Sequence, residues 1–184
     1  MRIITGSAKG MTLFSPKGDQ VRPTTEMAKE GMFSSIQFDI EGARVLDLFS
    51  GSGQLGLEAL SRGAAFAVFV DASQDSLNVT RQNVVKTGFT DRSRIIRSEY
   101  GEYIKNAGKQ NEKFDIVFAD PPYGKEIIGE IVKRLLKNGL LNDGAIVLCE
   151  TDNGEVELEG AEGIESVKKY KYGKTFVYMV RIGS

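Results

Sequence analysis

The central part of the chain alternates short apolar runs with longer segments whose apolar residues recur at helical spacing. The apolar runs predict strands at Arg44–Phe49, Ala67–Val70, Arg94–Arg97, Phe114–Ala119 and Ala145–Glu150. The segments between them predict helices at Gln54–Arg62, Gln74–Lys86, Tyr100–Asn106 and Ile127–Lys137. Because strands and helices alternate, we expect right-handed crossovers and a parallel sheet that is covered on both faces. The predicted fold class is therefore α/β.

The N-terminal end follows a different pattern. Two short apolar runs, Arg2–Thr5 and Met11–Phe14, flank a loop bounded by glycines and predict a β-hairpin. The segment Val21–Thr24 contains a proline and predicts a break in the chain. A helix should follow, because Thr25 is a suitable N-cap and Glu26 would lie in the first turn. These elements form an extension before the alternating part of the chain.

The C-terminal end also departs from strand–helix alternation. The segments Ser166–Tyr172 and Thr175–Arg181 predict two strands, and the Gly173–Lys174 pair between them suits a type II′ hairpin turn. An antiparallel pair should therefore close the otherwise parallel sheet. Every residue of Phe176–Val180 is apolar, which indicates a strand that is buried on both faces. The acidic segment Asp152–Glu165 contains no basic residue, and we expect it to form an exposed loop.

The composition is that of a globular protein and excludes several kinds of site. The chain has 184 residues, which suggests one compact domain. With one Cys and no His, it can form neither a disulfide framework nor a zinc–thiolate cluster nor a His-based catalytic triad, and we expect no metal. The N-terminus lacks the apolar core of a signal peptide, and no apolar run reaches 18 residues. We therefore expect a cytoplasmic protein that does not interact with membranes.

The net charge of −1 and the pI of about 5.7 do not favour general binding to nucleic acid. The two ends of the chain are nevertheless basic. Residues 1–24 hold four basic side chains and one acidic one, and residues 166–184 hold five basic side chains and no acidic one. These segments are either RNA-binding surfaces or ordinary solvated faces.

A glycine-rich loop follows the first strand of the alternating part. Gly51, Gly53 and Gly56 match the G-x-G-x-x-G pattern, in which glycines allow a tight turn and a close approach of backbone N–H groups to a ligand. Asp71 ends the next predicted strand, where its carboxylate can accept hydrogen bonds from both hydroxyls of a ribose. This arrangement fits NAD and S-adenosylmethionine about equally, and it can also be a plain tight turn. Asp47 favours S-adenosylmethionine slightly, because an acid is unfavourable beside a pyrophosphate but can pair with an ammonium group.

The segment Asp120–Pro121–Pro122–Tyr123 follows the fourth predicted strand, at the same edge of the sheet as the glycine loop. An amino group on a base is a poor nucleophile, because its lone pair is delocalised into the ring. Asp120 and the carbonyl of Pro121 can accept hydrogen bonds from such an amine and direct its lone pair toward a methyl donor, since two prolines fix the turn. Tyr123 offers a flat surface on which the base can stack. The alternative is a segment that only ends a strand, but together with the glycine loop it predicts an amino-methyltransferase.

Taken together, these motifs make the chain similar to the RsmD family of small-subunit (16S) ribosomal-RNA guanine-N2 methyltransferases. The resemblance covers nearly the whole length. It rests on Met1–Gly6, Arg22–Thr25, Val45–Gly53, Leu55–Gly63, Asp120–Tyr123 and Tyr172–Thr175. The glycine loop and Asp-Pro-Pro-Tyr are common among amino-methyltransferases, whereas Arg-Pro-Thr-Thr before the domain is much more particular.

The resemblance implies a Rossmann-like, seven-stranded methyltransferase sheet in residues 43–184. We also expect the N-terminal extension, residues 1–42, a hairpin and a helix, to contact RNA, because it lies outside the cofactor-binding fold and its first part is basic. The resemblance identifies S-adenosylmethionine as the cofactor and small-subunit ribosomal RNA as the partner, either naked or in an assembled ribosomal particle, and we expect a monomer. The cofactor-binding residues that it implies are Asp47, Phe49, Gly51, Gly53, Asp71 and Glu99. The candidate RNA contacts are Lys9, Arg22 and Thr24.

Two positions depart from the family pattern. Asp71 stands where the family more often has Glu, although either carboxylate can reach a ribose. Glu99, for which the resemblance implies a contact with adenine, stands in a Ser-Glu-Tyr context where the family usually has Gly-Asp-Ala.

Other functions remain open at this point. A DNA adenine or a protein glutamine methyltransferase would use the same Asp-Pro-Pro-Tyr chemistry, although DNA enzymes usually carry a separate recognition region, for which 184 residues leave no room. A non-catalytic RNA-binding scaffold would require a vestigial cofactor loop, yet no glycine or acid of that loop is missing.

Overall fold

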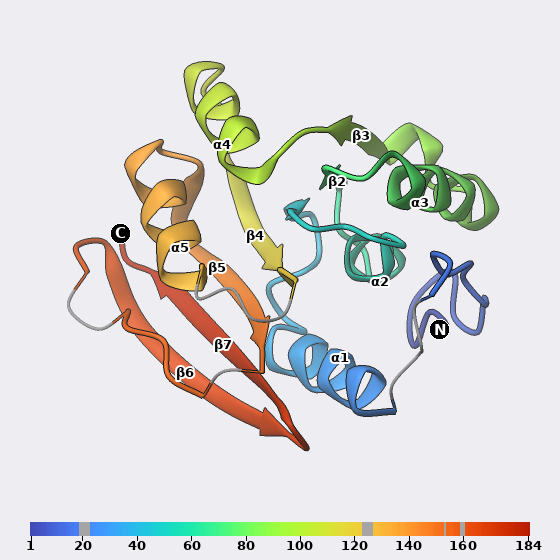
Figure 1. The fold of residues 1–184 in the computed structure, drawn as a ribbon, viewed down its shortest axis with the longest axis horizontal. Helices are drawn as coiled ribbons and strands as arrows, with labels where there is room; N and C mark the ends of the chain where they lie inside the picture. Colours follow the sequence, from blue (N-terminus) through green and yellow to red (C-terminus); the bar gives the residue numbers. More distant parts are fainter. Residues whose placement is uncertain (19–22, 123–126, 153, 159–160) are drawn as a thin grey trace.

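A computed structural model describes residues 1–18, 23–122, 127–152, 154–158 and 161–184 of the chain; for residues 23–25 it describes the backbone alone. A seven-stranded sheet in the order β3-β2-β1-β4-β5-β7-β6 forms its centre (Figure 1). The strands are β1 Arg44–Asp47, β2 Phe66–Asp71, β3 Ser93–Arg97, β4 Phe114–Ala119, β5 Leu141–Thr151, β6 Ile164–Tyr172 and β7 Thr175–Ile182. The helices are α1 Pro23–Ser35, α2 Gln54–Ser61, α3 Gln74–Thr87, α4 Tyr100–Lys109 and α5 Ile128–Lys137, and a short 3-10 turn spans Thr90–Arg92.

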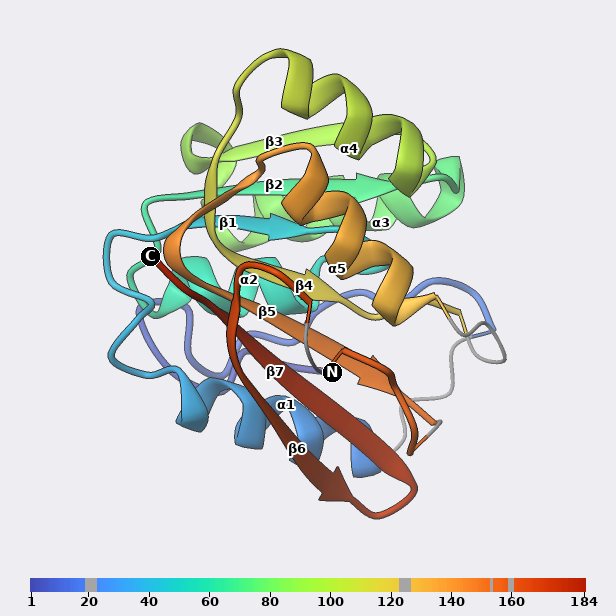
Figure 2. The ribbon, with the colours of Figure 1, turned by 90° about the vertical axis from the view of Figure 1, so that its left-hand side faces the viewer.

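The sheet lies between two layers of helices. Helices α4 and α5 cover one face, and α1, α2 and α3 cover the other (Figure 2). The core on the α1–α3 side includes Phe33, Leu57, Phe69 and Phe118, and the core on the α4–α5 side includes Ile131 and other aliphatic residues. Because both faces are covered, the central strands are apolar on both sides, which explains their continuous apolar runs in the sequence.

The structure confirms the predicted α/β fold, with shifts of a few residues at most element ends. Strands β1 to β5 are parallel, and β7 pairs antiparallel with both β5 and β6. Gly173 has a φ of 61° and Lys174 is not among the residues with positive φ, as a type II′ turn requires. Residues Val177–Val180 of β7 are buried, as their uninterrupted apolar sequence predicted.

The N-terminal segment differs from the prediction in two respects. Residues 1–14 form a hairpin-like loop with a single antiparallel bridge between Arg2 and Thr12, and no regular strand is present within residues 1–18. Helix α1 begins at Pro23, two residues before the predicted cap at Thr25. The reason is that the fixed φ of proline and its missing N–H suit the first turn of a helix, where no intrahelical partner for that N–H exists.

Within the described residues, no helix is long and apolar enough to cross a membrane. No group of three or more Asp, Glu, Cys or His side chains in those same ranges could hold a metal ion.

Candidate active site

Four acidic residues lie in a row at the carboxyl ends of four neighbouring strands. Asp71, Asp47, Asp120 and Glu150 follow the order of β2, β1, β4 and β5 across the sheet. In each strand the residue two positions earlier packs into the core on the α1–α3 side, and strand side chains alternate between faces. All four acids therefore belong to the same face of the sheet. We call these four residues the acidic row.

The glycine loop begins where β1 ends and turns into α2. Gly51 and Gly53 have φ values of 55° and 81°, a region that favours glycine, and Gly53 caps α2. Two side chains of α3 fix the loop, because the Thr80 hydroxyl donates to the Gly51 carbonyl at 2.8 Å and the Asn83 amide donates to the Ser52 carbonyl at 2.8 Å. The loop is therefore held in shape by hydrogen bonds to its carbonyl groups.

Asp71 is already engaged with the backbone of this region. One carboxylate oxygen accepts from Gly51 N–H at 2.9 Å, and the other accepts from Ser73 N–H at 2.9 Å. Each oxygen retains a further lone pair, so the carboxylate is held rigidly and can still accept hydrogen bonds from a ligand. The predicted contact with ribose is compatible with this geometry.

Asp47 is the most deeply placed acid of the row. It lies one pleat below its neighbours, because β1 pairs Asp47 with Phe69 of β2 and Phe118 of β4, two residues before Asp71 and Asp120. Asp47 is 2% exposed, and its carboxylate accepts a hydrogen bond from Gly56 N–H at 3.0 Å. Burial, together with the charges of Asp120 and Asp71, raises the pKa of Asp47 to about 7, although the hydrogen bond from Gly56 acts in the opposite direction. A cation bound nearby would relieve this unfavourable field.

Asp120 lies directly after β4 and is half-buried, while Pro121 is buried and Pro122 is exposed. The negative charge of Asp120 raises the pKa of Asp47 and also that of Glu150. Asp120 therefore lies between these two residues. The sequence motif is therefore joined to the glycine loop in space, as predicted. Tyr123, the last residue of the motif, lies outside the described residues.

Two further predicted cofactor residues lie on the α4 side of the loop. The ring of Phe49 packs against the ring of Tyr100, with centroids 5.4 Å apart. Glu99 is exposed at the N-cap of α4, where its carboxylate accepts from Gly101 N–H at 3.0 Å. This cap holds Glu99 at the carboxyl end of β3, one strand beyond Asp71, which is compatible with a contact to a purine ring.

The structure does not place Lys9 beside the acidic row. The loop that carries Lys9 docks on the last residue of α2, because Ser7 N–H donates to the Ser61 carbonyl at 2.8 Å. Helix α2 starts at the glycine loop and ends at the opposite edge of the sheet, so Lys9 lies toward the amino ends of the strands. Arg22 lies outside the described residues, and for Thr24 the structure gives only a backbone position in the first turn of α1.

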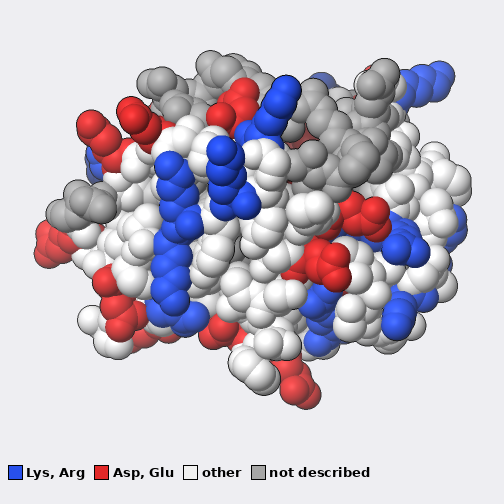
Figure 3. Space-filling model, turned by 90° about the horizontal axis from the view of Figure 1, so that it is seen from below, with Lys and Arg blue, Asp and Glu red and all other residues white. Residues whose placement is uncertain are grey.

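Charged side chains of both signs are interspersed over the face seen in Figure 3. A band of Lys and Arg crosses part of this face, with acidic side chains on both sides of it. This distribution agrees with the net charge of −1 and gives no large basic patch on the described part of this face.

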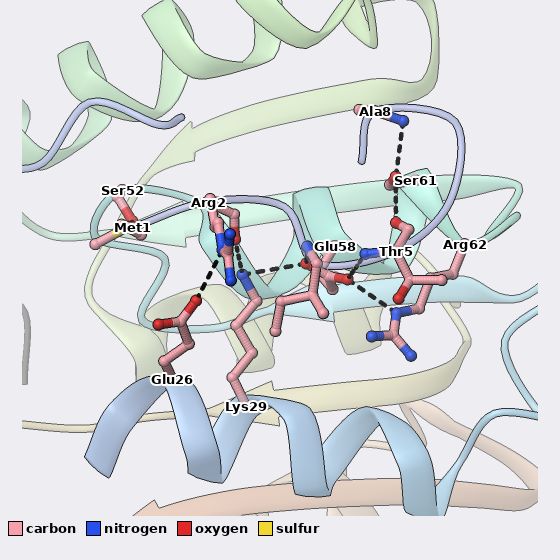
Figure 4. A network of polar contacts seen from close by, with 12 residues as sticks. Met1, Arg2, Thr5, Ala8, Glu26, Lys29, Ser52, Glu58, Ser61 and Arg62 are labelled. Carbon is pink, nitrogen blue, oxygen red and sulfur yellow. Dashed lines mark hydrogen bonds and ion pairs between the residues drawn. The ribbon is translucent and has the colours of Figure 1, made fainter. Parts of the chain in front are cut away.

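A buried network connects the N-terminal segment to the rest of the molecule (Figure 4). Glu58 of α2 is fully buried and accepts hydrogen bonds from the backbone of Ile4 at 2.9 Å and Thr5 at 3.0 Å. It also forms ion pairs with Lys29 of α1 at 3.1 Å and with Arg62 at 2.9 Å. The segment therefore shares the core with the sheet and is not a detached arm.

The close approach in this region depends on one glycine. A Cβ atom on Gly6 would lie 1.8 Å from the Ser61 carbonyl oxygen, and Gly6 has a φ of 95°. Only glycine fits there without a shift of the backbone.

Four polar residues that shape these regions, Thr80, Asn83, Glu58 and Glu150, were not among the residues predicted from the sequence. Thr80 and Asn83 occupy helix positions in line with buried Leu77 and Val84, so polar residues on an apolar helix face were the available signal. Glu58 stands inside an apolar run of its helix, and Glu150 ends an apolar strand in the same way that Asp71 does. In both cases a lone charge in an apolar segment was the signal.

The chemistry of the row fits a cationic nucleoside ligand. Asp71 offers acceptors for a ribose, the glycine loop offers a close backbone approach, and the buried Asp47 favours a positive group. A pyrophosphate would be repelled by the neighbouring carboxylates, which argues against NAD. The residues present therefore fit S-adenosylmethionine, whose sulfonium and ammonium groups are both positive.

Comparisons with known proteins agree with this description. A family model described as conserved hypothetical protein 95 matches residues 1–181. The chain is 34% identical over 178 residues to a putative rRNA methyltransferase, YlbH, of Bacillus subtilis, covering 96% of each protein. It is 34% identical over 155 residues to ribosomal RNA small subunit methyltransferase D of Escherichia coli K12, covering 83% of this chain and 75% of that protein.

Solved structures include close neighbours of this fold. The putative methyltransferase yhhF from Escherichia coli superposes with a TM-score of 0.86 at 28% identity, covering 100% of this chain and 98% of the other. A putative methylase from Haemophilus influenzae superposes with a TM-score of 0.82 at 26% identity, covering 100% of this chain and 98% of the other.

Proposed function

The chain belongs to the family described as conserved hypothetical protein 95, the RsmD family, and from this premise we propose that it methylates the exocyclic N2 amine of a guanine in small-subunit ribosomal RNA. The cofactor is S-adenosylmethionine, and the class of reaction is ribosomal-RNA methylation, as in the relatives named small subunit methyltransferase D. The observation that supports the proposal most is the position of Asp120 in the acidic row, next to the residues suited to the cofactor.

When bound, S-adenosylmethionine supplies an electrophilic methyl group on a positively charged sulfur. We propose that Asp71 holds the ribose, that Asp47 faces the ammonium group directly or through water, and that Phe49, Glu99 and the glycine loop complete the cofactor site. Holding the amine and the methyl group in line supplies much of the acceleration, since effective molarities of about 10⁵ M or more are attainable in this way.

Asp120 and the Pro121 carbonyl accept hydrogen bonds from the target amine in this proposal. As the N–C bond forms and the S–C bond breaks, the amine nitrogen becomes acidic and its extra proton passes to Asp120 or to water. Asp120 therefore need not remove a proton before the transfer. Stacking of the base on Tyr123 is part of the same proposal.

RNA must approach the carboxyl edge of the sheet for this reaction. Contacts of Arg22 and Thr24 with the RNA stay part of the proposal, because α1 begins directly after Arg22. Lys9 is a candidate for a more distant contact at the other edge. Lys174 is exposed in the β6–β7 turn, which lies at the carboxyl edge because Thr151 pairs with Phe176. We include Lys174 as a contact near the site, and we expect a monomer that acts on ribosomal RNA in the cytoplasm.

The test is a methyl-transfer assay with labelled S-adenosylmethionine on small-subunit ribosomal particles and on naked ribosomal RNA, both from cells that lack this protein. Mapping the modified nucleotide should give N2-methylguanine at one position. Asp120→Ala should lower the rate by about 100-fold or more, while calorimetry shows nearly unchanged cofactor affinity. Asp143→Asn, which removes an exposed acid at the amino end of β5, is the matched control and should behave like the wild type.

Two results would contradict the proposal. A normal rate for Asp120→Ala would remove the assigned mechanism. Transfer to DNA adenine or to a protein glutamine, with none to ribosomal RNA, would favour another amino-methyltransferase.

A further inference from the structure

Glu150 is a buried acid next to Asp120. The reaction proposed above assigns it no role. Glu150 is 4% exposed and ends the apolar part of β5. Ala119 pairs with Cys149, so Asp120 and Glu150 occupy the next position along two adjacent parallel strands. Both follow residues whose side chains face the α4–α5 side, and both therefore belong to the α1–α3 side.

Two carboxyl groups at this spacing do not ionise independently. Adjacent carboxylates repel each other, and burial removes the water that would otherwise stabilise the second charge. The pair therefore retains a proton at a pH where isolated carboxyl groups have lost theirs. Burial decides which group holds it, because the more deeply buried acid is the more costly one to ionise. Glu150 is buried, whereas Asp120 is half-buried.

The groups around Glu150 on the described elements do not supply a compensating cation. On β7 its partner is Val177, and beyond that strand lies Tyr170 of β6, which packs on the same side. Helix α1 covers this side of the sheet, and its buried Lys29 is paired with Glu58. Burial, followed by the charge of Asp120, raises the pKa of Glu150 to about 8.

We propose that Glu150 is a positioning residue that carries the single proton of the Asp120–Glu150 pair and thereby keeps Asp120 ionised. The inference rests on the proposed function for the identity of the group that Asp120 binds. A protonated Asp120 would offer a donor to the amine, whereas the reaction requires an acceptor. Because Glu150 carries the one proton of the pair, Asp120 is left as the acceptor.

The kinetic test compares the pH dependence of methyl transfer in four proteins: wild type, Glu150→Gln, Glu150→Ala and Asp152→Asn. Gln mimics the protonated acid, so Glu150→Gln should keep kcat within about threefold of the wild type near neutral pH. Asp120 stays ionised when Glu150 loses its proton, so the kcat of the wild type and that of Glu150→Gln should follow the same course as the pH rises through about 8. Glu150→Ala removes the buried side chain beside Asp120, so it should lower kcat by about tenfold or more with little change in cofactor affinity. Asp152 is an exposed acid just after β5, so Asp152→Asn should retain the wild-type profile.

Two outcomes would overturn the proposal. An inactive Glu150→Gln variant that folds and binds cofactor would mean that the ionised form of Glu150 is needed. A Glu150→Ala variant with the kcat of the wild type would mean that Glu150 does not position Asp120. The guanine itself titrates in every assay, so the kcat of each variant is compared with that of the wild type at the same pH.

A second measurement separates this inference from the proposed function. The pH dependence of unfolding of the free protein reports the proton on Glu150 without any substrate. The wild type should lose stability relative to Glu150→Gln as the pH rises toward about 8. If this difference appears but ribosomal RNA is not methylated, the proposed function fails and the proton assignment stands. If the difference is absent, the assignment fails even where methylation is observed.

Discussion

Two buried glutamates of this protein, Glu58 and Glu150, have opposite surroundings. Glu58 receives two backbone N–H groups and two basic side chains, which satisfy both of its oxygens. Glu150 lies beside another carboxylate, and burial together with that charge raises its pKa. The difference indicates that a fully compensated charge connects elements of the fold, whereas an uncompensated one marks a site suited to a positive ligand or a proton.

Breaking the compensated network should give the largest effect. Glu58→Ala would leave Lys29 buried without its carboxylate and the Ile4 and Thr5 N–H groups without acceptors, so we expect a loss of about 3–5 kcal/mol in the free energy of unfolding. Urea titration measures this loss, and hydrogen exchange at the two amides should accelerate. Glu26→Ala breaks only the Arg2–Glu26 pair, whose side chains are 66% and 46% exposed, and should cost about 0–1 kcal/mol. Equal losses in the two variants would mean that burial of the network contributes little.

Asp71→Ala tests the acidic row, whose carboxylates are available to a ligand. Each charged hydrogen bond lost with the ribose should cost about 1.5–3 kcal/mol of cofactor affinity. Calorimetry with S-adenosylmethionine measures this change, and Asp75→Asn, an exposed acid in the first turn of α3, is the control. The variant also frees Gly51 N–H and Ser73 N–H, so its melting temperature must be measured alongside. Unchanged affinity would refute this placement of the cofactor.

The two regions also differ in how far the sequence predicts them. The sheet, its antiparallel end and the link between the glycine loop and Asp120 follow from apolar periodicity and from the rule that parallel strands share one carboxyl edge. The position of Lys9 and the network around Glu58 could not be predicted. They depend on where residues 1–14 fold back onto α2, and no periodic pattern specifies such long-range docking. Glu150 stands out in the sequence as a lone charge at the end of an apolar strand. Its position beside Asp120 could be known only from the strand order, which makes β4 and β5 neighbours.

Titration of Asp47 should make stability depend on pH. Its pKa in the folded protein is raised from an ordinary 3.8 to about 7. Between these values the folded state holds a proton that the unfolded state has lost, so stability falls as the pH rises from about 4 to about 7. Asp47→Asn should reduce this slope by at most about 1.4 kcal/mol per pH unit. Chemical denaturation at several pH values measures the slope, and Asp143→Asn should leave it unchanged.

The smallest expected effect is on RNA binding. It tests which edge of the sheet the RNA contacts. Lys174 lies in the β6–β7 turn at the carboxyl edge, where the acidic row ends, whereas Lys9 lies on a loop that docks at the other edge. Both side chains are exposed, so their substitution should not affect folding.

A basic residue that contacts a phosphate releases a counterion on binding, and its loss flattens the dependence of log affinity on log salt by about 0.7 for single-stranded RNA. We therefore expect Lys174→Ala to flatten this slope by about that amount and Lys9→Ala to change it by much less. Fluorescence titration of a small-subunit ribosomal RNA fragment at several salt concentrations measures both slopes, and unchanged cofactor affinity serves as the control for folding. Because the reacting base must reach Asp120, the flanking phosphates should be held near the carboxyl edge. The opposite ranking of the two lysines would place the RNA along the N-terminal segment and assign the β6–β7 turn no part in binding.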